Sequence, residues 1–87
     1  MNSIARSVKN TNLHIAVAKN DIAEVKRLLK NKNAGLNFRN VIRNTSLHIA
    51  ARKGYIEIAK LLISNGANIN AVNMDGLTPL QPVTQVY

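Results

Sequence analysis

Two histidines, His14 and His48, are the residues of this 87-residue chain best suited to proton transfer or metal binding near neutral pH. A metal site needs more donors than the chain supplies, because it has no cysteine and only four acids. No Ser/His/Asp order, paired carboxylates or Gly-rich phosphate loop is visible. We therefore expect no catalytic residues, no metal site and no cofactor. The four acids are spread along the chain: Asp21, Glu24, Glu57 and Asp75.

Each histidine lies within the same string, Leu-His-Ile-Ala, which covers 13–16 and again 47–50. A damaged third copy begins at Thr78-Pro79-Leu80. The threonines that open the three copies are Thr11, Thr45 and Thr78, so their spacing is nearly constant. A period of about 33 residues indicates stacked supersecondary units. The first interval is slightly longer than the second, and the extra residue falls within 31–36, a polar stretch where a loop tolerates it.

Each unit is predicted to form two short helices. In the second unit Thr45 is placed to N-cap a helix that Gly54 stops, and another helix follows over 56–64. In the first unit Thr11 and Asn20 take these roles, and the second helix covers 21–30. The apolar spacing predicts the inward residues, which are Leu13, Ala16, Ile22, Val25, Leu28 and Leu29, then Leu47, Ala50, Ala51, Ile56, Ala59, Leu62 and Ile63.

These features resemble those of ankyrin-repeat proteins. The signature Thr-Pro-Leu-His-x-Ala appears as Thr-Asn-Leu-His-Ile-Ala at 11–16 and Thr-Ser-Leu-His-Ile-Ala at 45–50. The resemblance implies an all-α solenoid of antiparallel helix pairs joined by β-hairpin-like turns, with each histidine bracing a neighbouring turn. We expect an N-terminal flank at 1–9, repeats at 10–42 and 43–75, and a truncated third repeat at 76–87.

The chain departs from the family pattern in three places. Both complete signatures lack the proline that follows threonine. Arg43 stands where the hairpin turn normally has glycine, as Gly76 does, so the sequence predicts a remodelled or looser turn there. In the third copy Gln81 replaces histidine, and Pro82 would weaken a helix that continued through it.

The resemblance also implies where a partner binds: at the hairpin tips and on the exposed side of the first helices. By position, the predicted partner-binding residues are Val41, Ile42, Asn44, Arg52, Lys53, Lys19, Met74, Asp75 and Leu77. The first unit would add Ser7, Val8, Asn10 and Ala18. The adjacent aliphatics at 41 and 42 either form a binding spot or pack against the neighbouring turn.

The charge of the chain is strongly positive, with a formal net charge of +8. Four of the cations cluster on one predicted helix end: Lys26, Arg27, Lys30 and Lys32. A solvated helix face explains this cluster better than an anion-binding patch does. Separately, we expect a monomer whose basic, partly apolar concave face meets an acidic patch on a protein partner. A nucleic-acid partner is the weaker alternative, because the chain lacks aromatic stacking platforms and a recognisable reading motif.

The first residues contain no apolar run suited to a signal peptide, and no stretch is long enough for a membrane span. We expect an intracellular protein, with non-classical secretion left open. Repeat arrays usually need about three units and polar caps. The alternative to a binding module is therefore a remnant or fragment of a longer array with no activity of its own.

Overall fold

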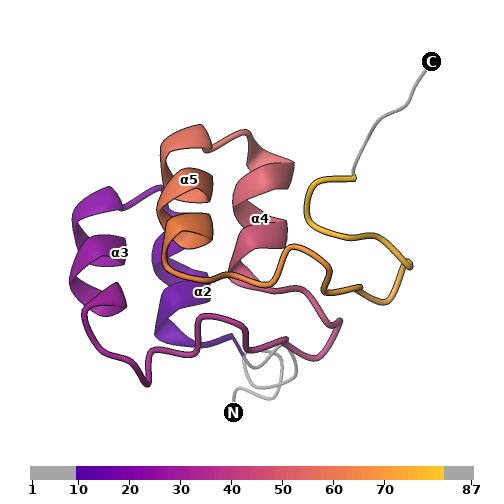
Figure 1. Ribbon diagram of the computed structural model, residues 1–87, viewed down its shortest axis with the longest axis horizontal. Helices are drawn as coiled ribbons and strands as arrows, with labels where there is room; N and C mark the ends of the chain where they lie inside the picture. The colour runs from indigo at the N-terminus through magenta and orange to yellow at the C-terminus, as the bar shows by residue number, and fades with distance from the viewer. Residues whose placement is uncertain (1–9, 82–87) are drawn as a thin grey trace, which may run out of the picture.

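The computed structural model describes residues 10–81, which form four α-helices in two antiparallel pairs (Figure 1). The first pair consists of α2 (Asn12–Ala18) and α3 (Ile22–Leu29). The second pair consists of α4 (Ser46–Lys53) and α5 (Ile56–Ser64). The described residues contain no β-strand, so the fold is all-α as predicted.

The helices α2 and α4 begin at threonine caps, as the sequence predicts. Thr45 adopts an extended conformation and its hydroxyl oxygen accepts a hydrogen bond from the backbone N–H of His48. The His48 side chain accepts in return from the Thr45 N–H, at 3.0 Å. Thr11 and His14 form the same reciprocal pair at the start of α2. Each pair satisfies two backbone donors that a helix start otherwise leaves free.

Left-handed residues end both first helices. Gly54 has φ 74° and Asn20 has φ 56°, which confirms both predicted stops. The residue after each stop returns a backbone N–H to the helix, from Tyr55 to Ala50 at 2.9 Å and from Asp21 to Ala16 at 3.0 Å. The chain therefore reverses sharply and starts the second helix antiparallel to the first.

The second helices differ in how they are capped. Asp21 caps α3 through its side chain, which accepts from the Glu24 N–H at 3.1 Å. Tyr55 precedes α5 and makes no side-chain capping bond. The predicted ranges of 21–30 and 56–64 are confirmed, with Asp21 and Lys30 as the residues that flank α3. The predicted extra residue of the first unit falls in the turns between α3 and α4, where Gly35 has φ 80°.

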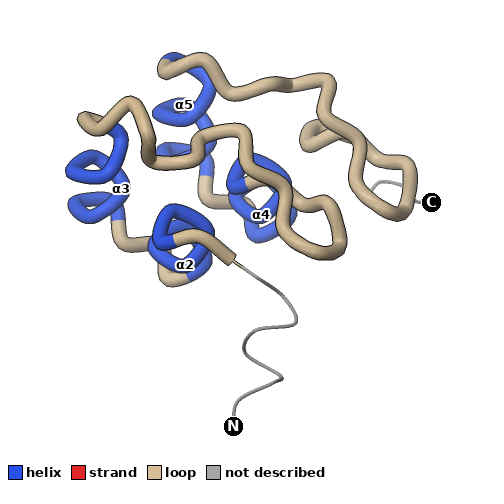
Figure 2. The backbone as a smooth tube through the Cα atoms, turned by 90° about the horizontal axis from the view of Figure 1, so that it is seen from below, coloured by secondary structure: helices blue, strands red, loops and turns tan. Residues whose placement is uncertain are grey.

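The helix pairs stack in register, α2 against α4 and α3 against α5. The loops that follow α3 and α5 run across the same end of the helices (Figure 2). The core forms where the pairs meet, because each pair offers one aliphatic stripe to the other. Its buried members are Leu13, Ala16, Val17, Val25, Leu47, Ala50, Ile58 and Leu62.

The inward face predicted for α5 is partly wrong. Ile56 and Ile63 are 64% and 42% exposed, whereas Ile58, which the sequence analysis left out, is fully buried. Their counterparts in the first unit, Ile22 and Leu29, are partly buried because they pack against the core. The second unit has no such covering helix pair among residues 10–81. The same apolar repeat position therefore packs against the core in the first unit and is exposed to solvent in the second.

The third unit begins like the others and then diverges. The hydroxyl and N–H of Thr78 both donate to the Gln81 side-chain oxygen, each at 3.2 Å. Gln81 thus takes the place of the cap histidine, and Pro79 is buried beside it. The described residues 78–81 form turns and not a helix. The predicted effect of Pro82, and the expected contacts of Ser7 and Val8, lie outside the described residues.

Candidate partner-binding surface

Each histidine joins one unit to the next. His14 lies fully buried and its Nε2 donates to the carbonyl oxygen of Asn44 at 2.9 Å. His48 donates in the same way to the carbonyl oxygen of Leu77 at 2.8 Å. The direction follows from the other ring nitrogen, since Nδ1 accepts a backbone N–H and must carry no proton. This confirms the bracing role that the resemblance implied.

The same contacts leave the histidines unsuited to general base catalysis. Both ring nitrogens of His14 and of His48 are occupied by protein groups. Burial lowers the pKa of His14 from its ordinary 6.5, and the hydrogen bond to the Asn44 carbonyl opposes that shift. Within residues 10–81 no three His, Asp or Glu side chains gather as metal ligands would.

Asparagines form a second set of links, which the sequence analysis did not identify. The Asn40 side-chain oxygen accepts from the N–H groups of Ile42 and Asn44, at 3.1 and 3.0 Å. Asn73 does the same for Asp75 and Leu77, at 2.9 and 3.1 Å. A carboxamide oxygen that accepts two backbone donors fixes the shape of a tight turn. Both hairpin turns are therefore built on the same residue type.

These asparagines also connect successive units. The Asn40 amide donates to the Asn10 side chain at 2.8 Å, and the Asn73 amide donates to the Asn44 side chain at 3.0 Å. Asn10 and Asn44 hold the same position in successive units, and so do Asn40 and Asn73. The recurrence of asparagine at these two repeat positions was thus the sequence signal that could have predicted the hydrogen bonds between units. Leu77 occupies the corresponding third position and cannot extend them.

Arg43 keeps the hairpin turn in a left-handed conformation. Its φ is 64°, close to the 77° of Gly76 at the equivalent position. Each turn is closed by a backbone hydrogen bond to its asparagine. The Arg43 N–H donates to the Asn40 carbonyl oxygen at 2.7 Å, and the Gly76 N–H donates to the Asn73 carbonyl oxygen at 3.0 Å. The predicted remodelled turn is therefore wrong. The contacts around Asn40 impose the turn, and the arginine adopts a disfavoured conformation within it.

The two hairpin tips lie side by side. The N–H of Met74 donates to the carbonyl oxygen of Ile42 at 3.2 Å. Met74 is 67% exposed, and the other aliphatic side chains of the tips are exposed as well. We call this surface the hairpin ridge and define it by its four members: Val41, Ile42, Met74 and Leu77. Val41 and Ile42 are 53% and 46% exposed, so neither side chain is buried against the neighbouring turn, and their role as a binding spot stays a prediction.

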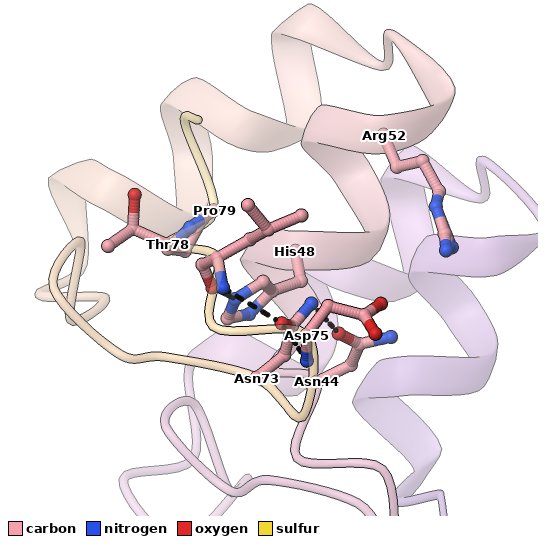
Figure 3. A pocket seen from close by; sticks show the side chains of 8 residues that line it. Asn44, His48, Arg52, Asn73, Asp75, Thr78 and Pro79 are labelled. Atoms are coloured by element: carbon pink, nitrogen blue, oxygen red, sulfur yellow. Dashed lines mark hydrogen bonds between the residues drawn. The ribbon is translucent and has the colours of Figure 1, made fainter. Parts of the chain in front are cut away.

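Arg52 reaches the ridge from α4. It lines a hollow together with Ile42, Asn44, Asn73, Met74 and Asp75. A smaller pocket of about 120 Å³ adjoins it, between α4 and the second hairpin (Figure 3). Its lining residues include His48, Thr78 and Pro79. The structure thus brings five predicted partner-binding residues together around this hollow: Ile42, Asn44, Arg52, Met74 and Asp75.

Of the predicted residues, Asn44 lines this hollow without a free side chain, and two lysines lie away from it. Asn44 is only 7% exposed and its side chain accepts from Asn73, so it supports the hairpins from below instead of offering a free side chain. Lys19 is exposed but lies at the end of α2, where it lines a separate hollow with Ile15. Lys53 is exposed at the end of α4 and lines neither hollow beside the ridge.

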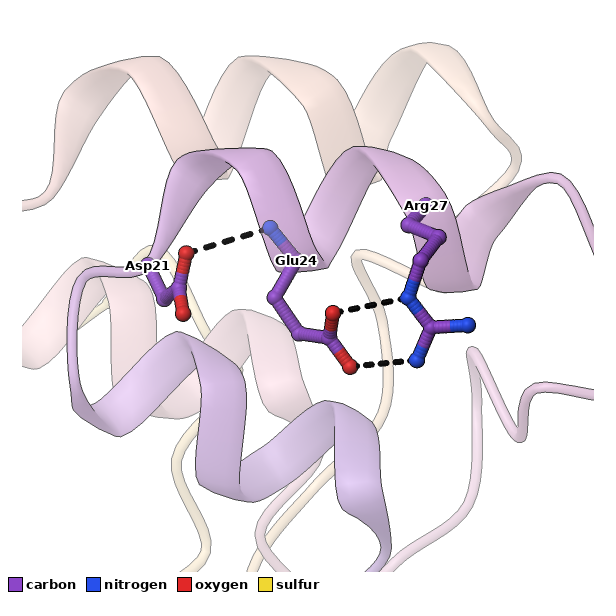
Figure 4. A network of polar contacts seen from close by, with 3 residues as sticks. All are labelled: Asp21, Glu24 and Arg27. Atoms are coloured by element: carbon purple, nitrogen blue, oxygen red, sulfur yellow. Dashed lines mark hydrogen bonds and ion pairs between the residues drawn. The ribbon is translucent and has the colours of Figure 1, made fainter.

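The basic cluster occupies another part of the molecule. Its four residues lie on or just after α3. Arg27 forms a two-point ion pair with Glu24, one turn earlier on the same helix (Figure 4). This pair lowers the pKa of Glu24, mainly through the hydrogen bond from Arg27. Because both side chains are open to solvent, the pair adds little to stability.

None of the helices in the described part of the chain has the length and apolarity that a membrane crossing demands. A comparison with curated proteins gave no match. A family model described as ankyrin repeats, in three copies, matches residues 2–81. Proteins of this kind are generally protein-interaction modules and typically non-catalytic. The match spans most of the chain and agrees with the stacked helix pairs, so the chain belongs to the ankyrin-repeat family.

Proposed function

We propose that this chain is a non-catalytic module that, as a monomer, binds a protein partner through the hairpin ridge and the adjoining side of α4. The observation that carries the proposal is the exposure of the four ridge residues on neighbouring turns. Exposed aliphatic side chains that cluster, and are not scattered singly, mark interaction sites on small proteins.

The ridge is held in place before any partner arrives. Asn40 and Asn73 fix the turns, and the bond from Met74 to Ile42 fixes one turn relative to the other. A partner that meets such a surface does not have to order it, so less of the contact energy is lost to conformational entropy. Because the two hairpin turns are held rigid in this way, they can serve as a binding surface although they are short.

The charges around the ridge favour a partner with an acidic patch. Arg43 and Arg52 are exposed beside it, and Asp75 is the single acid among the residues that line the two hollows there. The formal charge of the whole chain, +8, adds a long-range attraction for acidic surfaces. Complementary charge of this kind raises the association rate and selects among partners more than it raises affinity.

A photo-crosslinking amino acid at position 74, introduced into the full chain in its source cell, tests the proposal. We expect a discrete crosslinked protein whose yield falls when Ile42 is replaced by Glu. The matched control carries the crosslinker at Ile15, an exposed aliphatic position on α2 away from the ridge. Equal capture of the same protein from positions 74 and 15 would contradict the proposal.

The alternative, a fragment of a longer array without activity of its own, is favoured by one observation. Ile56 and Ile63 are exposed where the first unit is covered. Thermal melting followed by circular dichroism separates the two cases. A cooperative transition of the purified chain supports an independent module, whereas a gradual loss of helix supports the fragment.

A further inference from the structure

A second apolar surface lies at the α5 end of the stack, opposite the N-terminal unit. It is a shallow groove of about 290 Å³ between α4, α5 and the third-unit turn. We call it the end groove and define it by its lining residues: Ala50, Ala51, Gly54, Tyr55, Ile56, Ala59, Lys60, Ile63 and Leu80. This surface does not overlap with the hairpin ridge, because no ridge residue lines it.

The chain itself shows what fits such a groove. Val17, Ile22, Val25 and Leu29 hold the equivalent positions in the first unit, each one repeat before its counterpart in the end groove. There they are buried or partly buried by the packing of α4 and α5 on α2 and α3. The covering element is helical in the first unit. The end groove is formed by the same repeat positions, so its shape suits the aliphatic face of a helix.

The spacing of the apolar residues on α5 indicates what kind of helix the end groove would accept. Ile56, Ala59 and Ile63 follow one another at helical intervals, which places them on one stripe of the helix. The small Ala59 lies between the two isoleucines and lets a second helix approach at the centre. Lys60 is the one charged side chain among the residues that line the groove. An acidic side chain beside the aliphatic stripe would meet it.

A second copy of the chain fits the groove less well. Two α5 helices packed antiparallel about Ala59 bring Lys60 of one copy next to Lys60 of the other. Each copy also carries a formal charge of +8, which opposes their approach. From this charge pattern and the internal precedent, we propose that the end groove binds an amphipathic helix of another protein, with an aliphatic stripe flanked by acidic residues. This site is independent of the proposed ridge function.

The test uses the full chain and a synthetic helical peptide, five turns long and labelled with fluorescein. The peptide carries Leu at i, i+3, i+4 and i+7 positions and Glu beside them. We expect saturable binding by fluorescence anisotropy. A scrambled peptide of the same composition should bind at least ten times more weakly, because it has the same charge and no stripe. Equal binding of both peptides, or no binding of either, overturns the proposal.

Variants then locate the site. We expect Ile56→Glu to weaken peptide binding at least tenfold, and Lys60→Glu to weaken it at physiological salt but much less at high salt. Ile15→Glu is the matched control at the other end of the stack and should bind normally. Met74→Glu, on the ridge, should also bind normally, which keeps this test separate from the ridge proposal. Sedimentation that shows concentration-dependent dimers abolished by Ile56→Glu would assign the groove to a second copy and overturn the proposal.

Discussion

His48 Nε2 donates to the carbonyl oxygen of Leu77 at 2.8 Å and thereby ties α4 to the residue that precedes Thr78. The contact repeats the one from His14 to Asn44, at 2.9 Å, one unit earlier. A single side chain thus caps its own helix and fixes the next turn. The position of the second hairpin, and with it half of the ridge, depends on this histidine.

His48→Ala should destabilise the fold by about 2 kcal/mol, because it leaves a partly buried carbonyl and a helix-cap N–H without partners. Urea unfolding followed by circular dichroism measures the change. Lys60→Ala, on the exposed face of α5, is the control and should change stability by less than about 0.5 kcal/mol. A His48→Ala protein as stable as the control would show that the Leu77 contact is dispensable.

Stability should fall as the pH drops below about 6.5. Burial lowers the pKa of His14 in the folded chain, so the unfolded chain takes up a proton first. The stability contributed by neutral His14 is complete above the ordinary pKa of 6.5 and declines as pH falls from there toward the lowered value. Unfolding free energies at pH 7.5 and 5.5, compared with those of His14→Gln, test this. The variant should show a smaller difference, and an equal difference would contradict the assignment.

Ser46→Ala should stabilise the chain by about 1 kcal/mol. The Ser46 side chain is fully buried at the first position of α4, and its hydroxyl is without a hydrogen-bond partner among the described residues. Removing the hydroxyl removes its desolvation cost and leaves the helix start intact. Thr45→Ala is the contrasting change, since it deletes the cap and should destabilise by about 1 kcal/mol. Denaturation midpoints of the two variants should move in opposite directions.

Arg43→Gly should also stabilise, by about 1 kcal/mol, because glycine adopts positive φ without a Cβ clash. Gly76→Ala places a side chain at the same point of the other hairpin and should destabilise by a similar amount. A reciprocal effect of this kind would confirm that both turns demand the left-handed conformation. Loss of stability in Arg43→Gly would mean that the arginine side chain makes contacts that outweigh its backbone strain.

The sequence predicted the elements well because their signals are local. Threonine caps and the stops at Asn20 and Gly54 each act within one helix, and the structure places them as expected. The features that the sequence did not predict depend on contacts with an adjacent repeat unit. Ile56 looks inward by its spacing, yet only a covering helix pair would bury it. Asn44 was assigned to the surface by position, but Asn73, from the next hairpin, engages its side chain. Which predicted ridge residues contact a partner stays a prediction.

If the hairpin ridge binds a protein partner, the affinity for that partner must depend on the exposed aliphatic side chains of the ridge. Once the protein crosslinked at position 74 is identified, isothermal titration of that protein should give a defined affinity for the parent chain. The double variant Ile42→Glu, Met74→Glu should bind at least a hundredfold more weakly while it unfolds at the same urea concentration. Unchanged affinity in a correctly folded double variant would show that the partner binds elsewhere on the chain.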